Sequence, residues 1–353
     1  MTKKWMLLLF LLFSICSASF GASPNAAEAQ LAFWNDIPGF LNQQHAYSLV
    51  TVEELLEKYP PTLGESLERC SAFFLLDNVF HDPEAKNYES VQQFFIRRTR
   101  IVANALQEVS VTEGMHIWKL YNHGFIVRTS TATIAFDLVS GKHIGSEGFC
   151  LPEDVVEVYA NQCDALFISH LHLDHADENV AQAFISKGKP VVVPENLWQK
   201  ESFSNKLSYL ERSADKVHSL PVQDGKKQLE VVIYPGHQGM KLLNNVTLVR
   251  MSDDITVVHT GDQSNLMDFT WIDAISENHQ VDILLPNCWT TDMPRMIAGV
   301  DPAVVITGHE NELGHSIDHR EPYWLNAARI GDGITRYVAM TWGESFVYRK
   351  VVK

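Results

Sequence analysis

His170-Leu171-His172-Leu173-Asp174-His175 places three imidazoles and one carboxylate within six residues. The stretch follows directly on residues 165–169, an apolar run that predicts a buried strand. Side chains alternate along an extended chain, so His170, His172 and Asp174 would point to one side. Imidazole nitrogens and carboxylate oxygens are ligands of zinc and similar ions. The stretch therefore predicts a metal site whose remaining ligands come from elsewhere in the chain.

Polar residues follow three apolar, strand-like runs further along the chain. They are His237 after residues 231–236, Asp262 after residues 257–261, and His309 after residues 304–308. Each stands in or beside a glycine-containing turn, where a rigid sheet can aim a side chain into a shared cleft. His315 is the alternative to His309, which is favoured because it follows its strand directly. Together with the opening stretch, these residues predict one composite metal site.

The order His-x-His-x-Asp-His, His, Asp, His resembles the metallo-β-lactamase superfamily of hydrolases over residues 115–353. The resemblance implies an α+β fold, a four-layer αβ/βα sandwich with two metal ions at one edge. It also implies a ligand set and a supporting acid. His170, His172 and His237 would hold the first metal, Asp174, His175 and His309 the second, Asp262 would bridge both, and Asp137 would support the ligands.

Short segments resemble different branches of that superfamily. Pro235-Gly236-His237 and Thr260-Gly261-Asp262 are similar to glyoxalase II. His123-Gly124-Phe125 is similar to the ascorbate lactonase and N-acylphosphatidylethanolamine phospholipase D branch. A diiron redox role is not favoured, because the related oxygen-reducing proteins carry a glutamate where this chain has His172. The branch stays open.

The resemblance implies a dinuclear hydrolase that uses a metal-bridging hydroxide to cleave an ester, lactone or phosphodiester bond. Two divalent ions, zinc by preference and manganese or iron as alternatives, would lower the pKa of the bridging water. Asp174 and Asp262 would be the catalytic carboxylates, with Asp174 orienting the nucleophile or passing a proton to the leaving group. The alternative is a metal- or ligand-binding module without catalysis on the same fold. Complete occupation of the ligand positions favours the enzyme.

Residues after His309 form a polar and aromatic cluster that predicts substrate contacts. His315, Arg320 and Tyr323 are the candidates, with Arg320 as the natural partner of a carboxylate or phosphate, and a hydrogen-bonded loop is the alternative. The substrate is expected to be a small molecule or a lipid. A formal charge of -15 disfavours nucleic acid as a partner. Membrane contact and the oligomeric state are left open.

The N-terminus has the pattern of a secretory signal peptide over residues 1–22, which predicts a periplasmic or secreted protein. Lys3 and Lys4 precede an apolar stretch at residues 5–15, and small residues follow. A lipoprotein anchored through Cys16 is less favoured. The cysteines beyond the signal are Cys70, Cys150, Cys163 and Cys288. Disulfides and free thiols are equally compatible with these four, and Cys150 and Cys163 are close enough in sequence to form a bridge.

Residues 23–112 predict a helical extension, and residues 113–353 a domain of strands mixed with helices. One helix is expected to begin at Thr51, with an N-cap and early acids, and to end near Pro60; another spans residues 90–109. Phe33-Trp34 and Phe73-Phe74 are expected to pack these helices together. In the second region, residues 179–187, 197–212 and 267–277 are the predicted helices.

Overall fold

A computed structural model of the protein describes residues 35–350 of the 353-residue chain. The predicted signal peptide, Cys16 and Phe33-Trp34 lie outside the described residues. The chain divides into two compact units, Met1–Gln44 and His45–Lys353. The second unit contains the later helices of the extension together with both β-sheets. The domain boundaries proposed from the sequence stay a prediction.

Three long helices precede the sheets: α3 (Ile37–Lys58), α4 (Leu67–Phe80) and α5 (Glu89–Glu108). The helix predicted over residues 90–109 is confirmed as α5. The predicted start at Thr51 is wrong, because helix α3 is continuous through this position. The Thr51 hydroxyl donates to the Tyr47 carbonyl at 3.1 Å, a bond within the helix that replaces the expected cap.

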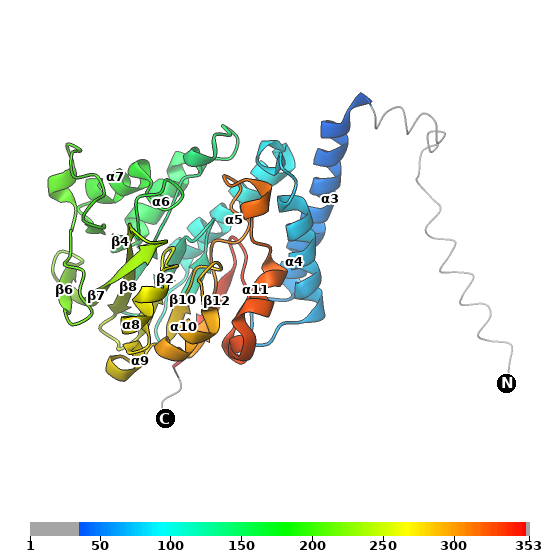
Figure 1. The fold of residues 1–353 in the computed structure, drawn as a ribbon. Helices are drawn as coiled ribbons and strands as arrows, with labels where there is room; N and C mark the ends of the chain where they lie inside the picture. Colours follow the sequence, from blue (N-terminus) through cyan, green and yellow to red (C-terminus); the bar gives the residue numbers. More distant parts are fainter. Residues whose placement is uncertain (1–34, 351–353) are drawn as a thin grey trace. The chain divides into compact units, whose positions relative to one another are not determined.

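Two six-stranded mixed sheets follow (Figure 1). The first has the order β12-β1-β2-β3-β4-β5 and the second the order β11-β10-β9-β8-β7-β6. The strands are β1 (Met115–Lys119), β2 (Phe125–Arg128), β3 (Thr133–Phe136), β4 (Ala165–Phe167), β5 (Val191–Val192), β6 (His218–Val222), β7 (Lys227–Gln238), β8 (Leu242–Arg250), β9 (Thr256–His259), β10 (Ile283–Leu285), β11 (Val304–Val305) and β12 (Ser345–Tyr348). Strands β3, β4 and β5 are parallel, as are β9, β10 and β11.

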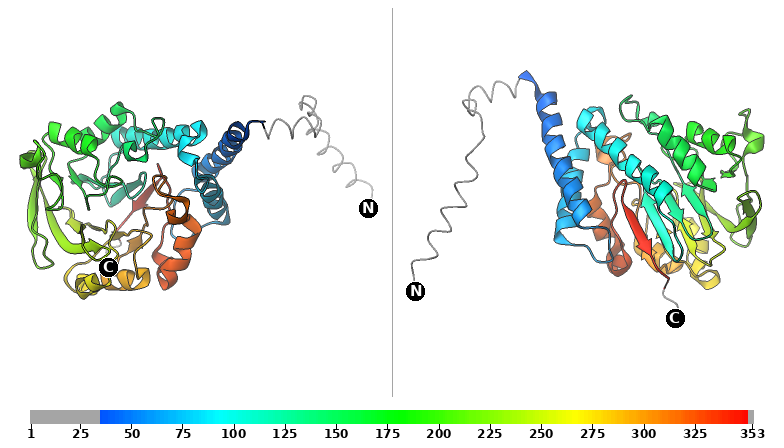
Figure 2. Two further views of the ribbon diagram at one scale, coloured as in Figure 1. Left: turned by 45° about the horizontal axis from the view of Figure 1, so that its top comes forward. Right: turned by 180° about the vertical axis from the view of Figure 1, so that it is seen from behind.

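Helices cover the outer faces of the two sheets. Figure 2 shows α6 (Glu153–Gln162) and α7 (Glu178–Ser186) on one side, and α8 (Phe269–Ile272), α9 (Ile275–Asn278) and α10 (Met293–Val300) on the other. Helix α7 contacts β4 and β5, and α11 (Tyr323–Ile330) packs beside α4. The short 3₁₀ helices are η1 (Ala85–Asn87), η2 (Lys142–Ile144), η3 (Ser204–Lys206), η4 (Leu266–Asp268), η5 (Ile317–His319) and η6 (Gly331–Arg336).

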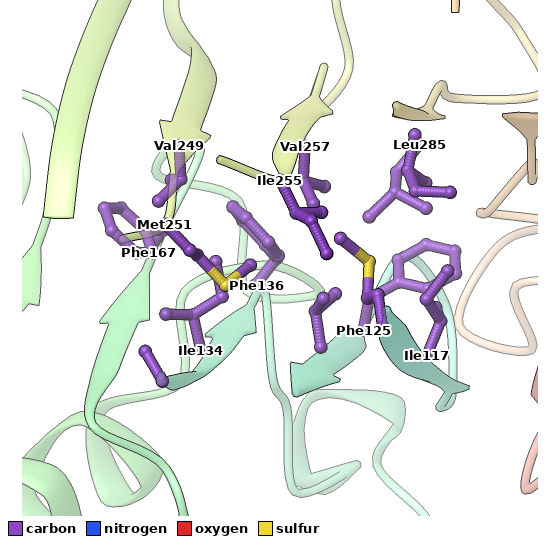
Figure 3. Close-up of a cluster of buried hydrophobic side chains, with 14 of the residues drawn as sticks. Ile117, Phe125, Ile134, Phe136, Phe167, Val249, Met251, Ile255, Val257 and Leu285 are labelled. Carbon is purple, nitrogen blue, oxygen red and sulfur yellow. The ribbon is translucent and has the colours of Figure 1, made fainter. Parts of the chain in front are cut away.

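The main core lies between the two sheets. Ile134 and Phe136, two residues apart on β3, point to the same side, as the alternation of a strand requires. Figure 3 shows them facing Val257 of the second sheet and Ile255 just before β9, across a layer of buried apolar side chains. This layer joins the sheets face to face, and it confirms the predicted α+β sandwich.

The prediction of a helix over residues 197–212 is wrong. Only η3 forms there, because part of the segment pairs with β5 in an extended conformation. The Ser208 amide donates to the Val191 carbonyl at 2.8 Å, and the Val193 amide donates to the Ser208 carbonyl at 3.1 Å. Among the described residues, the helix expected over 267–277 is divided into η4, α8 and α9.

The four described cysteines are free thiols, so the Cys150–Cys163 bridge is not formed. Cys163 and Cys288 are buried. Of the helices in residues 35–350, none combines the length and the apolar character that crossing a membrane requires.

Candidate metal centre

The predicted metal ligands meet at one edge of the sandwich. His170 follows β4 of the first sheet, and Asp262 and His309 follow β9 and β11 of the second. The Asn245 amide on β8 donates to the Ser169 carbonyl at 2.8 Å, which joins the two sheets beside His170. Within each sheet, the parallel strands end at a common edge. Because the two edges lie beside each other, His170 and Asp262 come together here, although they are 92 positions apart in sequence.

Asp262 lies at the middle of a buried cluster of carboxylates and imidazoles. Its Oδ1 is 3.2 Å from His175 Nε2, and its Oδ2 is 3.6 Å from both His170 Nε2 and His309 Nε2. Asp174 Oδ2 lies 3.4 Å from His175 Nε2 and 3.2 Å from His309 Nε2. The three histidines are fully buried. The structure therefore brings five of the seven predicted ligands into one cluster.

Hydrogen bonds orient several of these rings from behind. His175 Nδ1 is 2.7 Å from Asp137 Oδ2, and His170 Nδ1 is 3.0 Å from Ser169 Oγ. These contacts leave Nε2 of each ring directed at the cluster. A partner on the far ring nitrogen is the usual support of a metal-binding histidine. Asp137 thus makes the contact expected of a supporting acid.

His172 and His237 lie at the outer part of the site. A ring nitrogen of His172 is within 4.8 Å of ligand atoms of His170 and Asp262, and the side chain is partly exposed. His237 does not join a group of this kind among the described residues. Its Nδ1 is 2.9 Å from Asp268 Oδ1, and its neighbour Gln238 donates to Asp262 Oδ2 at 2.9 Å. A ligand role for His237 stays a prediction.

His309 and His315, the two alternatives for the last histidine ligand, both lie in the site. Ligand atoms of Asp174, His309 and His315 are within 4.8 Å of one another. The Trp289 ring lies 5.2 Å from the His309 ring and 5.3 Å from the His315 ring, between centroids. Since only His309 also approaches Asp262, it is the one that reaches the middle of the cluster.

The charged groups of the cluster shift one another's pKa values. Burial, with His175 nearby, lowers the pKa of His170 to about 3. Burial also lowers the pKa of His309, but Asp262 and Asp174 outweigh it and raise the value to about 9. Burial raises the pKa of Asp262, but His175 and His309 hold it well below its usual value. The ionised carboxylates are therefore balanced by imidazole protons, and a divalent cation can take the place of those protons.

Unpaired buried atoms test whether a cation fits. His170 Nε2 and His175 Nε2, which face the carboxylates of the cluster, are buried and make no hydrogen bond. A buried polar atom without a partner is costly, so each needs an explanation. Imidazole nitrogens and carboxylate oxygens together suit zinc and similar ions. The residues present therefore fit a divalent metal.

Two of the three predicted substrate contacts are buried elsewhere. The Arg320 guanidinium donates to the carbonyl oxygens of Phe80 at 2.7 Å, Asp82 at 2.9 Å and Leu313 at 3.1 Å, and its Nε donates to His315 O at 3.1 Å. Tyr323 is 4% exposed, and its hydroxyl lies 2.7 Å from Thr341 Oγ1. The structure therefore corrects the sequence prediction for Arg320 and Tyr323, which hold the loop together. His315 remains at the site.

His123 belongs to the cluster, although no metal or catalytic role was predicted for it. It is fully buried, neither ring nitrogen makes a hydrogen bond, and one of them is within 4.8 Å of ligand atoms of His175 and Asp262. Its position beside Gly124, after a strand, repeats the pattern that singled out His237 and could have revealed it. Asp268 and Asn287, which contact His237 and Asp262, have no such signal.

The His123 ring occupies the space beside Gly308. A Cβ added at Gly308 would lie 2.2 Å from His123 Cδ2, and the next residue is His309. We expect Gly308→Ala to displace one of these rings, to cost about 1–3 kcal/mol of stability and to weaken metal binding. Equilibrium dialysis and thermal unfolding measure both effects. The double variant His123→Ala/Gly308→Ala should recover part of the metal affinity, and unchanged metal binding by Gly308→Ala alone would contradict this account.

No protein-family model matches the chain, and a search among curated proteins found no match. Solved structures do match. Igni18, a metallo hydrolase from the archaeon Ignicoccus hospitalis, aligns with a TM-score of 0.52 at 16% identity, over 67% of this chain and 99% of its own. At this identity the likeness concerns the fold, and it agrees with the predicted metallo-β-lactamase sandwich.

Two other structures align less well. An isothiocyanate hydrolase from Delia radicum gut bacteria has a TM-score of 0.48 at 14% identity, over 67% of this chain and 100% of its own. CmlA, a diiron β-hydroxylase from Streptomyces venezuelae, has a TM-score of 0.46 at 13% identity, over 69% of this chain and 55% of its own.

Proposed function

We propose that this protein is a metal-dependent hydrolase that cleaves an uncharged ester or lactone. One observation carries the proposal: Asp174, Asp262 and three buried histidines converge at the edge of a sandwich fold, and Nε2 of His170 and of His175 faces the carboxylates without a hydrogen bond. The proposed ligands are His170, His172 and His237 for one cation, Asp174, His175 and His309 for a second, and Asp262 for both. Zinc is the first choice, and manganese or iron also suits these ligands.

Divalent cations at this centre would supply hydroxide near neutral pH and polarise the scissile carbonyl. The chain's own residues hold the geometry. Gln238 and Asn287 donate to the two oxygens of Asp262, which fixes the orientation of its carboxylate. Asn122 Nδ2 donates to the Asp174 main-chain carbonyl at 2.8 Å and to Asp174 Oδ2 at 3.3 Å. Asp174 is thus held where it can orient a water molecule or receive a proton.

The charge around the centre favours an uncharged substrate over a phosphodiester. Arg320 is engaged by main-chain carbonyls, as described above. Arg212 Nη2 donates to the Gly236 and Asn244 carbonyls, and Arg329 is paired with Glu321 at 2.9 Å. A free guanidinium is the usual clamp for a phosphate. These three arginines are used within the protein, so an ester or lactone is the better fit.

Metal removal tests the proposal. The full chain, stripped with a chelator and dialysed, should lose hydrolysis of p-nitrophenyl esters and a lactone, and zinc or manganese should restore it. Elemental analysis of the restored protein should give two ions per chain. Bound metal also stabilises the folded state, by about 2.7 kcal/mol at a concentration 100 times the dissociation constant. A reloaded protein that turns over neither esters nor lactones would favour the binding module without catalysis. A phosphodiester preferred over both would contradict the bond assignment.

Export is part of the same proposal. The N-terminal pattern over residues 1–22 supports a signal peptide and a periplasmic or secreted product. N-terminal sequencing of the protein after expression in a secreting host tests it. Cleavage near residue 22 is the expected result, and a retained N-terminus in the cytoplasmic fraction would reject it.

A further inference from the structure

Five large apolar side chains are exposed in segments that also carry residues of the metal centre. Leu173 is 68% exposed, Met240 84% and Met267 72%, and Leu171 and Leu266 are also exposed. We call these five side chains the apolar collar. Exposed apolar residues that are scattered singly need no explanation, whereas a group gathered at one site indicates binding.

Each member of the apolar collar is close in sequence to a residue of the centre. Leu171 and Leu173 alternate with His170, His172 and Asp174 in the opening stretch. Met240 lies three residues after His237, in the turn between β7 and β8. Leu266 and Met267 lie in η4, shortly after Asp262. The apolar collar therefore comes from three separate segments, each of which also carries predicted ligands.

Hydrogen bonds bring these segments together. The Gly239 amide, beside Met240, donates to Ser264 Oγ at 2.9 Å, and the Ser264 amide donates to the His237 carbonyl at 3.0 Å. The His237 amide donates to Asp268 Oδ2 at 2.8 Å, which ties the β7–β8 turn to η4. The segment that carries Leu171 and Leu173 meets the other two through His172. A ring nitrogen of His172 is within 4.8 Å of ligand atoms of His170 and Asp262. The three segments that carry the apolar collar therefore meet beside the polar, buried centre.

We propose that the apolar collar holds an apolar acyl chain of the ester, so that the substrate class is an acyl ester with several methylene groups. This inference rests on the proposed function. The metal centre would take the ester carbonyl, and the apolar collar would remove the chain from water. Specific sites combine apolar walls with a few polar groups that fix orientation, which is the arrangement found here. The arginines near the centre are occupied, so apolar contact is what the site offers for recognition.

A series of p-nitrophenyl esters tests the inference with the metal-loaded full chain. Burial of one methylene corresponds to about a fourfold gain in kcat/KM. The octanoate ester should therefore exceed the acetate ester by at least tenfold in kcat/KM, even with partial burial. The variant Leu173→Ser/Met267→Ser should lose at least fivefold on the octanoate, mainly through KM, and its ratio of octanoate to acetate kcat/KM should fall below the wild-type ratio. Both side chains are exposed, so the variant should fold normally.

A matched control and a binding readout complete the experiment. Leu67→Ser changes a leucine of 80% exposure on α4, outside the collar, and should leave the chain-length profile unchanged. Calorimetry with 1-octanol, with and without bound metal, should show binding that Leu173→Ser/Met267→Ser weakens. If circular dichroism shows that the double variant is unfolded, Leu173→Gln replaces it.

The outcomes separate the two proposals. Metal-dependent ester hydrolysis with equal kcat/KM for acetate and octanoate would reject the acyl-binding role of the apolar collar. The proposed hydrolase function would be unaffected by that result. Absence of ester hydrolysis in the metal-loaded protein would reject the proposed function. In that case octanol binding still decides on the apolar collar: binding weakened by the double variant supports it, and binding that is absent or insensitive to the variant rejects it.

Discussion

Asp262→Asn is expected to reduce ester hydrolysis on the order of 10³-fold or more and to lower the bound metal below the wild-type content. Asp262 approaches three buried histidines, at 3.2 to 3.6 Å, and no other carboxylate in the cluster contacts His170. The substitution preserves size and removes the charge that balances bound cations. Steady-state kinetics and elemental analysis on the same preparation measure both effects.

A carboxylate outside the cluster serves as the control for this variant. Asp253 is half-buried between β8 and β9 and accepts from Ser130 Oγ at 3.0 Å, so Asp253→Asn should retain full activity and metal. Circular dichroism should show that both variants fold. Full metal content together with full activity in Asp262→Asn would remove Asp262 from the centre and with it the proposed mechanism.

The second large effect concerns the buried ion pair next to His309. Lys119 Nζ lies 2.6 Å from Glu310 Oε2, both side chains are 1% exposed, and the ammonium also donates to the Met340 carbonyl at 2.8 Å. We expect Glu310→Ala to lower the free energy of unfolding by about 3–5 kcal/mol, because it leaves the Lys119 charge buried without its partner. Urea unfolding measures this. Since Glu310 directly follows His309, metal binding should weaken as well.

Two further variants decide whether the unpaired charge is the cause. Lys119→Met/Glu310→Leu leaves no buried charge and should recover much of the lost stability. Arg97→Ala breaks an ion pair with Glu53 whose side chains are 48% and 26% exposed, so it should cost at most about 1 kcal/mol. A Glu310→Ala protein as stable as the Arg97→Ala protein would contradict the argument.

The region before the sheets holds the loop that carries the last histidines. Asp77 Oδ1 on α4 accepts from Asn311 Nδ2 and from the Tyr323 amide, each at 2.8 Å. Arg320, in the same loop, donates to the carbonyls of Phe80 and Asp82, at and just after the end of α4. Helix α4 is therefore a structural support of the metal centre. The sequence, in which α4 is separated from this loop by more than 200 residues, contains no sign of these contacts.

Local pattern was sufficient for the strands that precede His170, Asp262 and His309 and for the middle of the metal centre. An apolar run followed by a polar residue at a turn predicts a strand with a side chain at its end, and β4, β9 and β11 follow this rule with His170, Asp262 and His309. The same reasoning was wrong for residues 197–212, where pairing with β5 outweighs the local helical preference. It was also wrong for Thr51, because a possible cap inside a longer helix bonds to the preceding turn.

The sequence by itself determined a domain of strands mixed with helices and the run of carboxylates and imidazoles, because strand period and ligand chemistry are properties of neighbouring residues. The sandwich was implied by the family resemblance that this run carries. Only the tertiary structure decided which polar groups serve the centre. It brings His123 beside His175 and Asp262, and it turns Arg320 away from the site. The physical reason is that burial and hydrogen bonding depend on which distant segments meet, and a buried guanidinium binds whichever carbonyls the fold brings to it.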